Sequence, residues 1–310
     1  MRSLVTGGAG FIGSNLVDAL LARGDEVTVV DDLSTGRRAN LEGALAAGAE
    51  LVELDIRDGE ALRKLGEDER PERIFHLAAQ IDVRKSLADP AFDAAINVGG
   101  TANVLDAARA GDCGRVVFVS TGGAIYGEGE GQDLPLAEDA PIAPLAAYGQ
   151  SKYAAEGYLA LYERLYGLSG VSLRLGNVYG PRQDPLGEAG VIAIFCGALK
   201  EGRRPTIFGD GTQTRDYIYV GDVVAAALAA AESEVTGPIN IGTGRETSVL
   251  EIVNALRKLS GSENFEPELA PPRAGEVQRI ALDAGRAERE LGWQAEVGLD
   301  EGLRLTLSSV

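Results

Sequence analysis

The sequence is poor in residues that bind metal ions or form disulfides. It has two cysteines, Cys113 and Cys196, and one histidine, His76, among 310 residues. The cysteines lie far apart without metal-ligand spacing, so we expect two reduced core thiols in a cytosolic protein. A single histidine excludes a histidine-based metal site. Because His76 stands in an apolar run, we expect it in a buried strand with its hydrogen bonds satisfied.

Positive charge is also scarce, and long hydrophobic runs are missing. Lys and Arg number 29 against 47 Asp and Glu, which gives a formal net charge of -18. This charge repels nucleic acid and anionic membranes, so neither is expected as a partner. No apolar run reaches the length of a membrane span, and Met1 and Arg2 lead directly into the first predicted strand without a signal peptide. We therefore expect a cytoplasmic location.

Glycine, in contrast, is abundant, and three glycines form a pattern. Gly7, Gly10 and Gly13 stand three apart between a β-branched run and an amphipathic run. This spacing predicts a strand, a tight turn that cradles a pyrophosphate, and the start of a helix. Asp31 ends the next β-rich run, where a carboxylate accepts hydrogen bonds from both hydroxyls of an adenine ribose. The sequence thus predicts a dinucleotide site.

Asp31 also predicts which dinucleotide binds. A carboxylate at that position repels the ribose phosphate of NADP, so we expect NAD. Arg37 and Arg38 follow closely and are the residues that would reach such a phosphate. We interpret them as solvated residues at a helix start.

Strand and helix patterns alternate through the first half of the chain. Apolar β-rich runs at 51–54, 74–77, 116–119 and 172–175 are separated by helical segments, which predicts a doubly wound parallel sheet. The later elements are shorter, and segment 217–241 is expected to return to the sheet. We predict an α/β fold with two parts. A dinucleotide-binding domain comprises residues 1–176 and about 213–245, and a second, smaller mixed α/β substrate domain comprises 177–212 and 246–310.

A tyrosine and a lysine form the candidate catalytic pair. Tyr148 and Lys152 stand four apart on a predicted helix that continues to Tyr166, so they project to the same side. A free tyrosine is about 0.1% ionised at neutral pH. We expect the ammonium and a positively charged nicotinamide to lower the Tyr148 pKa by about three units, which would make it a general base and acid. Ser120 and Thr121 end the fifth strand at the same cleft and offer a bridging hydroxyl.

Together with the segment Arg174–Arg182, these features resemble the extended short-chain dehydrogenase/reductases of the NAD-dependent epimerase/dehydratase family. The resemblance covers nearly the whole chain and implies a Rossmann-like sheet. It also implies an NAD site made of Gly7, Gly10, Phe11, Ile12 and Gly13 at the pyrophosphate, Asp31 at the ribose, Asp55 and Ile56 at the adenine, and Leu77, Ala78, Ala79, Asn97, Tyr148 and Lys152 around the nicotinamide.

In this family a Ser or Thr at the end of the fifth strand completes a catalytic triad with Tyr148 and Lys152. The segment Thr121–Tyr126 is one residue longer than the common family spacing. We assign Thr121, because the strand end fixes the geometry, and Ser120 remains the alternative. For the substrate, the resemblance implies that Asn177 contacts the diphosphate and that Arg215 and Arg273 hold the nucleotide. It also implies that Glu276 contacts the uridine ribose and that Val191, Thr206 and Phe208 flank the base.

The family members most similar in these motifs imply NAD-dependent, reversible 4-epimerisation of a UDP-hexose, UDP-glucose or UDP-galactose, through a transient 4-keto sugar. Three alternatives stay open: 4-epimerisation of UDP-glucuronate, 4-epimerisation of a UDP-N-acetylhexosamine, and reduction of a nucleotide-sugar 4-ketone. A non-enzymatic protein that senses the cofactor is a more remote alternative. Gly122 and Gly123 replace the Asp-Glu dyad of related dehydratases, which argues against dehydration. Relatives pair two helices in a dimer, so we expect a homodimer through surplus apolar residues on the corresponding helices: Val104, Leu105, Leu159, Leu161 and Leu165.

Overall fold

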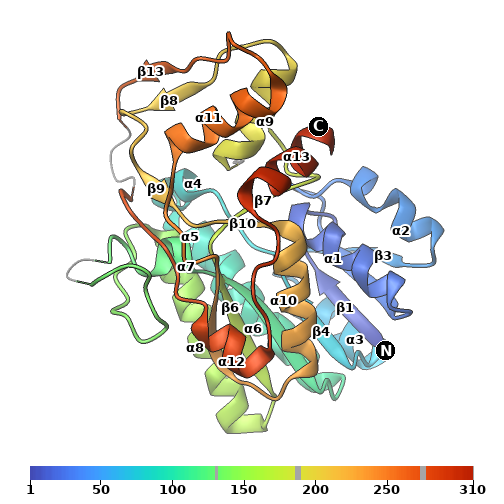
Figure 1. Cartoon of the computed structure of the whole chain (residues 1–310). Coiled ribbons are helices and arrows are strands. Elements are labelled where there is room, and N and C mark those ends of the chain that lie inside the picture. Colours follow the sequence, from blue (N-terminus) through green and yellow to red (C-terminus); the bar gives the residue numbers. More distant parts are fainter. Residues whose placement is uncertain (130–131, 186–189, 273–276, 310) are drawn as a thin grey trace.

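A parallel sheet forms the centre of the molecule (Figure 1). The computed structural model describes residues 1–129, 132–185, 190–272 and 277–309. The seven sheet strands, in spatial order, are β3 (Glu50–Glu53), β2 (Glu26–Asp31), β1 (Arg2–Thr6), β4 (Arg73–His76), β5 (Arg115–Thr121), β6 (Gly170–Leu175) and β11 (Gly237–Ile241). All neighbouring pairs are parallel. The strand order reverses between β1 and β4, and ligands of such sheets bind outside the carboxyl ends at this point.

Helices cover both faces of the sheet, because each strand is followed by a crossover that must bury its apolar stripe. One face carries α1 (Phe11–Ala22) and α10 (Val220–Glu232), and the other carries α3 (Gly59–Glu69), α6 (Thr101–Ala110) and α8 (Ala147–Tyr166). The shorter elements of this part are the 3-10 helix η1 (Arg38–Leu41), α2 (Glu42–Ala46), α4 (Val83–Ala88), α5 (Pro90–Ala94), the π-helix η2 (Ala95–Gly100), α7 (Gly122–Ile125) and α12 (Gly285–Leu291).

The later segments build a smaller mixed α/β part with its own core. Its helices are α9 (Val191–Lys200), α11 (Val249–Ser260) and α13 (Leu299–Ser309), which bury Phe195, Ile252 and Leu303 together. Three pairs of short strands lie outside the main sheet: β7 (Asn177–Tyr179) with β10 (Tyr217–Tyr219), β8 (Thr206–Phe208) with β13 (Glu268–Ala270), and β9 (Thr214–Arg215) with β12 (Thr247–Ser248). The predicted fold class is therefore confirmed.

Several local predictions are also confirmed. The four predicted runs fall on β3, β4, β5 and β6, and segment 217–241 returns to the sheet through β11. His76 is buried, and its ring nitrogens lie 2.7 Å from Thr6 Oγ1 and 3.0 Å from Thr101 Oγ1. Burial lowers the pKa of His76 to about 3.

Within the described residues, no helix has both the length and the apolar character needed to cross a bilayer.

The surplus apolar residues predicted for a dimer surface are partly wrong. Val104, Leu105 and Leu159 are buried in the core under α3, α6 and α8, because these helices also pack against one another. Leu165 is exposed as predicted, and the other large exposed apolar side chains of α8 are Tyr153, Tyr158 and Tyr166.

Candidate active site

The turn after β1 has the geometry of a phosphate-binding loop. Gly7 has a φ of +71°, and a Cβ there would lie 2.6 Å from the backbone nitrogen of Ala78. A Cβ on Gly13 would lie 2.2 Å from the carbonyl oxygen of Gly7. Helix α1 begins after Gly10 without a side-chain cap, so its first N–H groups point toward an anion site. The turn and the first residues of α1, Phe11 and Ile12, thus present backbone N–H groups of the kind that can bind a diphosphate.

Asp31 lies beside this turn. Its carboxylate accepts hydrogen bonds from the backbone N–H groups of Ala9 and Leu33, each at 2.9 Å. Burial raises the pKa of Asp31, and these two hydrogen bonds oppose the effect. A Cβ on Gly36 would lie 2.7 Å from Asp31 Oδ1, so the following loop passes directly over the carboxylate.

The two arginines of that loop are already paired with acids. Arg37 contacts Asp184 at 2.5 Å, and Arg38 contacts Glu53 at 3.0 Å. Both arginine side chains are largely exposed, as expected for solvated residues.

The segments expected around the adenine and nicotinamide lie at the carboxyl ends of β3 and β4. Arg57 donates to the Asp55 carboxylate and lowers its pKa, and Ile56 is buried against Gly100. Leu77 continues β4 by donating to the Thr6 carbonyl, and Ala78 and Ala79 follow it.

Asn97 connects this edge of the sheet to α8. It is buried in η2, accepts a hydrogen bond from the Gln80 N–H at 2.8 Å, and donates to the Ser151 hydroxyl at 3.1 Å. Ser151 in turn donates to the carbonyl of Tyr148. The segment after β4 and the first turn of α8 are therefore held together by one side chain.

Thr121, Tyr148 and Lys152 meet at the carboxyl end of β5. The Thr121 hydroxyl lies within hydrogen-bonding reach of the Tyr148 phenol and favours its ionised form. Lys152 is buried, and its Nζ donates to the carbonyl of Val119 at 2.8 Å. Ser120 points elsewhere and donates to Glu156 at 2.7 Å. The geometry thus favours Thr121 over Ser120 as the bridging hydroxyl.

The chain by itself does not lower the Tyr148 pKa, and the predicted lowering, which depends on a bound nicotinamide as well as on Lys152, stays a prediction. Burial, and next the negative charge of Asp93, raise the Tyr148 pKa to about 12. The Lys152 ammonium is directed at the Val119 carbonyl and lies 4.7 Å from the centre of the Phe118 ring. Burial lowers the pKa of Lys152 to about 8, while the charges of Asp93 and Glu156 oppose that effect. A further positive charge is needed to favour the phenolate.

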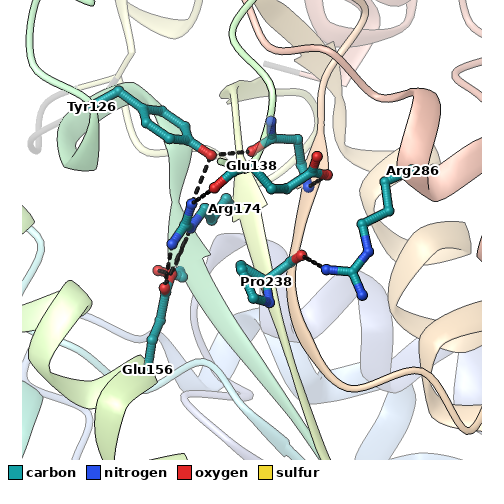
Figure 2. Close-up of polar contacts among 8 residues, drawn as sticks. Tyr126, Glu138, Glu156, Arg174, Pro238 and Arg286 are labelled. Atoms are coloured by element: carbon teal, nitrogen blue, oxygen red, sulfur yellow. Dashed lines mark hydrogen bonds and ion pairs between the residues drawn. The ribbon is translucent and has the colours of Figure 1, made fainter. Parts of the chain in front are cut away.

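A buried ion pair connects β6 to α8 close to Lys152 (Figure 2). Arg174 of β6 contacts Glu156 of α8 at 2.7 Å, and it also donates to the Tyr126 hydroxyl at 2.8 Å. The Tyr126 hydroxyl donates to Asn240 of β11 at 2.8 Å. Sequence reasoning missed this network, although Glu156 stands one helical turn beyond Lys152 and Arg174 opens the recognised segment. That spacing was the available signal.

The predicted substrate residues are spread over several elements of the smaller part. Asn177 begins β7, Val191 begins α9, and Thr206 and Phe208 bound β8. Arg215 lies in β9 and donates to the carbonyl of Thr214. Arg273 and Glu276 lie outside the described residues.

The two glycines after Thr121 have close neighbours. A Cβ on Gly122 would lie 2.5 Å from a Leu282 methyl carbon, and one on Gly123 would lie 3.4 Å from Asn177 Oδ1. A side chain at Gly122 would therefore have to displace the buried Leu282 side chain.

The chain belongs to the NAD dependent epimerase/dehydratase family, whose model matches residues 3–242. A UDP-glucose 4-epimerase of Mycolicibacterium smegmatis is 48% identical over 309 residues, which cover 99% of this chain and 97% of that protein. The solved UDP-glucose 4-epimerase of Thermotoga maritima with UDP-glucose is 45% identical, with a TM-score of 0.95 and coverage of 100% and 98% of the two chains. The Thermus thermophilus UDP-glucose 4-epimerase complex with NAD is 44% identical, with a TM-score of 0.91 and the same coverage.

Proposed function

We propose that this protein is an NAD-dependent enzyme that interconverts UDP-glucose and UDP-galactose by reversible 4-epimerisation, within galactose metabolism. The observation that carries the proposal is the meeting of Thr121, Tyr148 and Lys152 beside a phosphate-binding turn. The UDP-glucose 4-epimerases that resemble this chain over almost its whole length support the same activity.

Tyr148 acts as the general base and acid. It takes the proton from the hydroxyl at carbon 4 of the hexose and returns it after the sugar has turned, so the reaction has no net redox change. Thr121 bridges the phenol and the sugar hydroxyl, and Lys152 supplies positive charge in a buried site. Bound NAD would supply the hydride acceptor and donor that the oxidation and reduction of carbon 4 require.

The NAD contacts follow the geometry of the sheet. The glycine turn with Phe11 and Ile12 holds the diphosphate, and Asp31 receives the ribose hydroxyls. Asp55 and Ile56 flank the adenine, and residues 77–79 with Asn97 line the nicotinamide pocket. Residues 1–176 with 213–245 thus form the cofactor-binding domain in this proposal.

The remaining segments, 177–212 and 246–310, form the UDP-sugar domain. Asn177, Arg215 and Arg273 hold the diphosphate and nucleotide, Glu276 the uridine ribose, and Val191, Thr206 and Phe208 the base. Because the binding energy lies in the nucleotide, the hexose is free to turn within the site. Local arginines supply the positive charge that a strongly acidic chain needs at an anionic ligand.

We also propose a cytoplasmic homodimer. Helix α8 exposes Tyr153, Tyr158, Leu165 and Tyr166, and nearby α5 exposes Phe92. Such a group of large exposed apolar side chains is typical of an interaction surface. Light scattering at micromolar concentration should give the mass of two chains, and a single-chain mass contradicts this assembly.

The function is tested by incubating the purified protein with UDP-glucose, UDP-galactose, UDP-glucuronate and UDP-N-acetylglucosamine, without added cofactor. We expect UDP-glucose and UDP-galactose to interconvert. If only UDP-glucuronate or only UDP-N-acetylglucosamine turns over, that sugar nucleotide becomes the proposed substrate. No turnover of any UDP-sugar by protein that contains NAD would overturn the activity.

A further inference from the structure

Asp93 is a buried carboxylate with an unusual environment. It lies on α5 with no exposed surface, and its Oδ1 accepts hydrogen bonds from Gln80 Nε2 at 2.8 Å and Asn97 Nδ2 at 3.2 Å. Its Oδ2 is buried and has no hydrogen-bond partner among the described residues. The carboxylate therefore receives hydrogen bonds from two neutral amides and, within the described part of the chain, none from a cation. A buried charge in this state is costly unless an opposite charge lies nearby.

The nearby opposite charge is the ammonium of Lys152. Helix α5 packs against α8, and the charge of Asp93 acts on both Tyr148 and Lys152. Lys152 itself is 3% exposed and contacts a carbonyl and an aromatic ring, neither of which carries a formal charge. Among the described residues, neither of these two buried side chains has an oppositely charged group at hydrogen-bonding distance, and the charge of Asp93 acts on Lys152.

Glu156 is the other carboxylate near Lys152, but its charge is already neutralised. It accepts hydrogen bonds from Arg174 Nε and Nη2 and from the Ser120 hydroxyl. Of these two carboxylates, Asp93 is therefore the one whose charge can balance that of Lys152. Other titratable or charged groups near these helix starts are His76 on β4, which stays neutral, Tyr148 on α8, Asp82 at the start of α4, Arg84 and Lys85 on α4, and Asp89 at the start of α5. Farther along the packed helices lie Asp106 and Arg109 on α6 and Glu163 and Arg164 on α8.

We propose that Asp93 is a positioning residue that keeps Lys152 in its ammonium form within the closed site. This inference rests on the proposed function only where it concerns catalysis. The interaction between Asp93 and Lys152 exists whether or not the protein epimerises a sugar. The same carboxylate opposes ionisation of Tyr148. Asp93 therefore favours the protonated form of both Lys152 and Tyr148 until the positive charge of a bound ligand offsets the charge of Asp93.

The test is a titration of Lys152 that does not depend on turnover. Lysine side chains labelled with carbon-13 are followed by NMR against pH, and the Lys152 signal is identified by its loss in Lys152→Met. The chain has few lysines, so the signals are resolvable. The parent protein should titrate at about 8. In Asp93→Asn the midpoint should fall by about one unit, the usual effect of removing one nearby opposite charge.

The direction of the change separates this role from a merely structural one. If Asp93→Asn only loosened the site, water would reach Lys152 and its pKa would rise toward the ordinary value of about 10.4. Asp93→Glu keeps the charge and should leave the midpoint near that of the parent. Asp89→Asn removes a carboxylate from the start of the same helix while keeping a capping side chain, and it should also leave the midpoint unchanged. An unchanged or raised midpoint in Asp93→Asn overturns the proposal.

Folding provides a second test if Asp93→Asn does not fold alone. The variant is then combined with Lys152→Met, which removes both charges together. If the two charges balance each other, the double variant folds, and a double variant that stays unfolded contradicts the proposal. If the parent protein fails to epimerise any UDP-sugar while the Lys152 titration behaves as expected, the proposed function fails and the role of Asp93 stands.

Discussion

Arg174 and Glu156 form a buried ion pair (Figure 2). Their side chains are 3% and 8% exposed, and Arg174 reaches both carboxylate oxygens through Nε and Nη2. The pair joins β6 to α8 one turn beyond Lys152, and Ser120 connects it to the end of β5. The positions of the strand end and the catalytic helix therefore depend on the same two side chains.

Breaking this pair should strongly destabilise the protein. Glu156→Gln leaves the buried guanidinium of Arg174 without a counter-charge, and we expect the free energy of unfolding to fall by about 3–5 kcal/mol. Asp68→Asn is the control, because the exposed pair of Lys64 and Asp68 should contribute little in water. Urea denaturation measures both variants. Equal stability of Glu156→Gln and the parent would show that the pair is not coupled to folding.

Removing the phenol hydroxyl of Tyr148 should abolish most turnover without affecting the fold. We expect Tyr148→Phe to retain NAD and to lose at least about a hundredfold in rate, the usual scale for a general acid/base. Tyr153→Phe is a matched control on the exposed side of the same helix and should keep the parent rate. Steady-state kinetics with UDP-galactose measure the difference. Near-parent activity of Tyr148→Phe would exclude the mechanism.

The two hydroxyls at the end of β5 should have separable roles. Thr121→Val removes the hydroxyl next to Tyr148 and should lower the rate with little change in stability. Ser120→Ala removes a hydrogen bond to Glu156 and should cost about 1 kcal/mol of stability with a small effect on rate. Kinetics and denaturation of both variants check this pattern. The reverse pattern would assign the bridging role to Ser120.

The bound dinucleotide should be NAD. In the proposed site the Asp31 carboxylate lies at the ribose, and a ribose phosphate bound there would meet a like charge at a cost of several kcal/mol. Arg37 and Arg38 contribute little in return, because Asp184 and Glu53 already engage them at the surface. Chromatography of the dinucleotide released on denaturation identifies it. Recovery of mainly NADP would show that the arginines decide the cofactor.

His76 should make folding sensitive to mild acid. Its folded-state pKa is about 3 and its unfolded value is about 6.5, so between these values the unfolded chain binds more protons. Stability contributed by neutral His76 is present above about pH 6.5 and is lost as the pH falls, by about 1.4 kcal/mol per unit.

Comparison with His76→Gln isolates this effect. His76 is the only histidine, and the substitution keeps a side chain that can hydrogen-bond Thr6 and Thr101. The free energy of unfolding of the parent should fall more steeply between pH 6 and 5 than that of the variant. Parallel curves would mean that His76 does not control the acid response.

Features that depend on short stretches of chain were predictable from sequence. The need for glycine at position 13 is local, because a Cβ there would meet the carbonyl oxygen of Gly7 in the same loop. The shared face of Tyr148 and Lys152 follows from helix geometry alone. The alternation of strands and helices likewise dictated the doubly wound sheet. The sequence by itself was therefore enough to predict the fold class, NAD as the cofactor and the candidate catalytic pair.

Other features required segments distant in the chain to come together. The choice between Thr121 and Ser120 depends on Glu156 and Arg174, which draw Ser120 away from Tyr148. The raised pKa of Tyr148 depends on burial and on the charge of Asp93, which no local pattern reveals. Burial, desolvation and the sum of charges around a side chain arise only when helices and strands pack, so only the tertiary structure decided these properties.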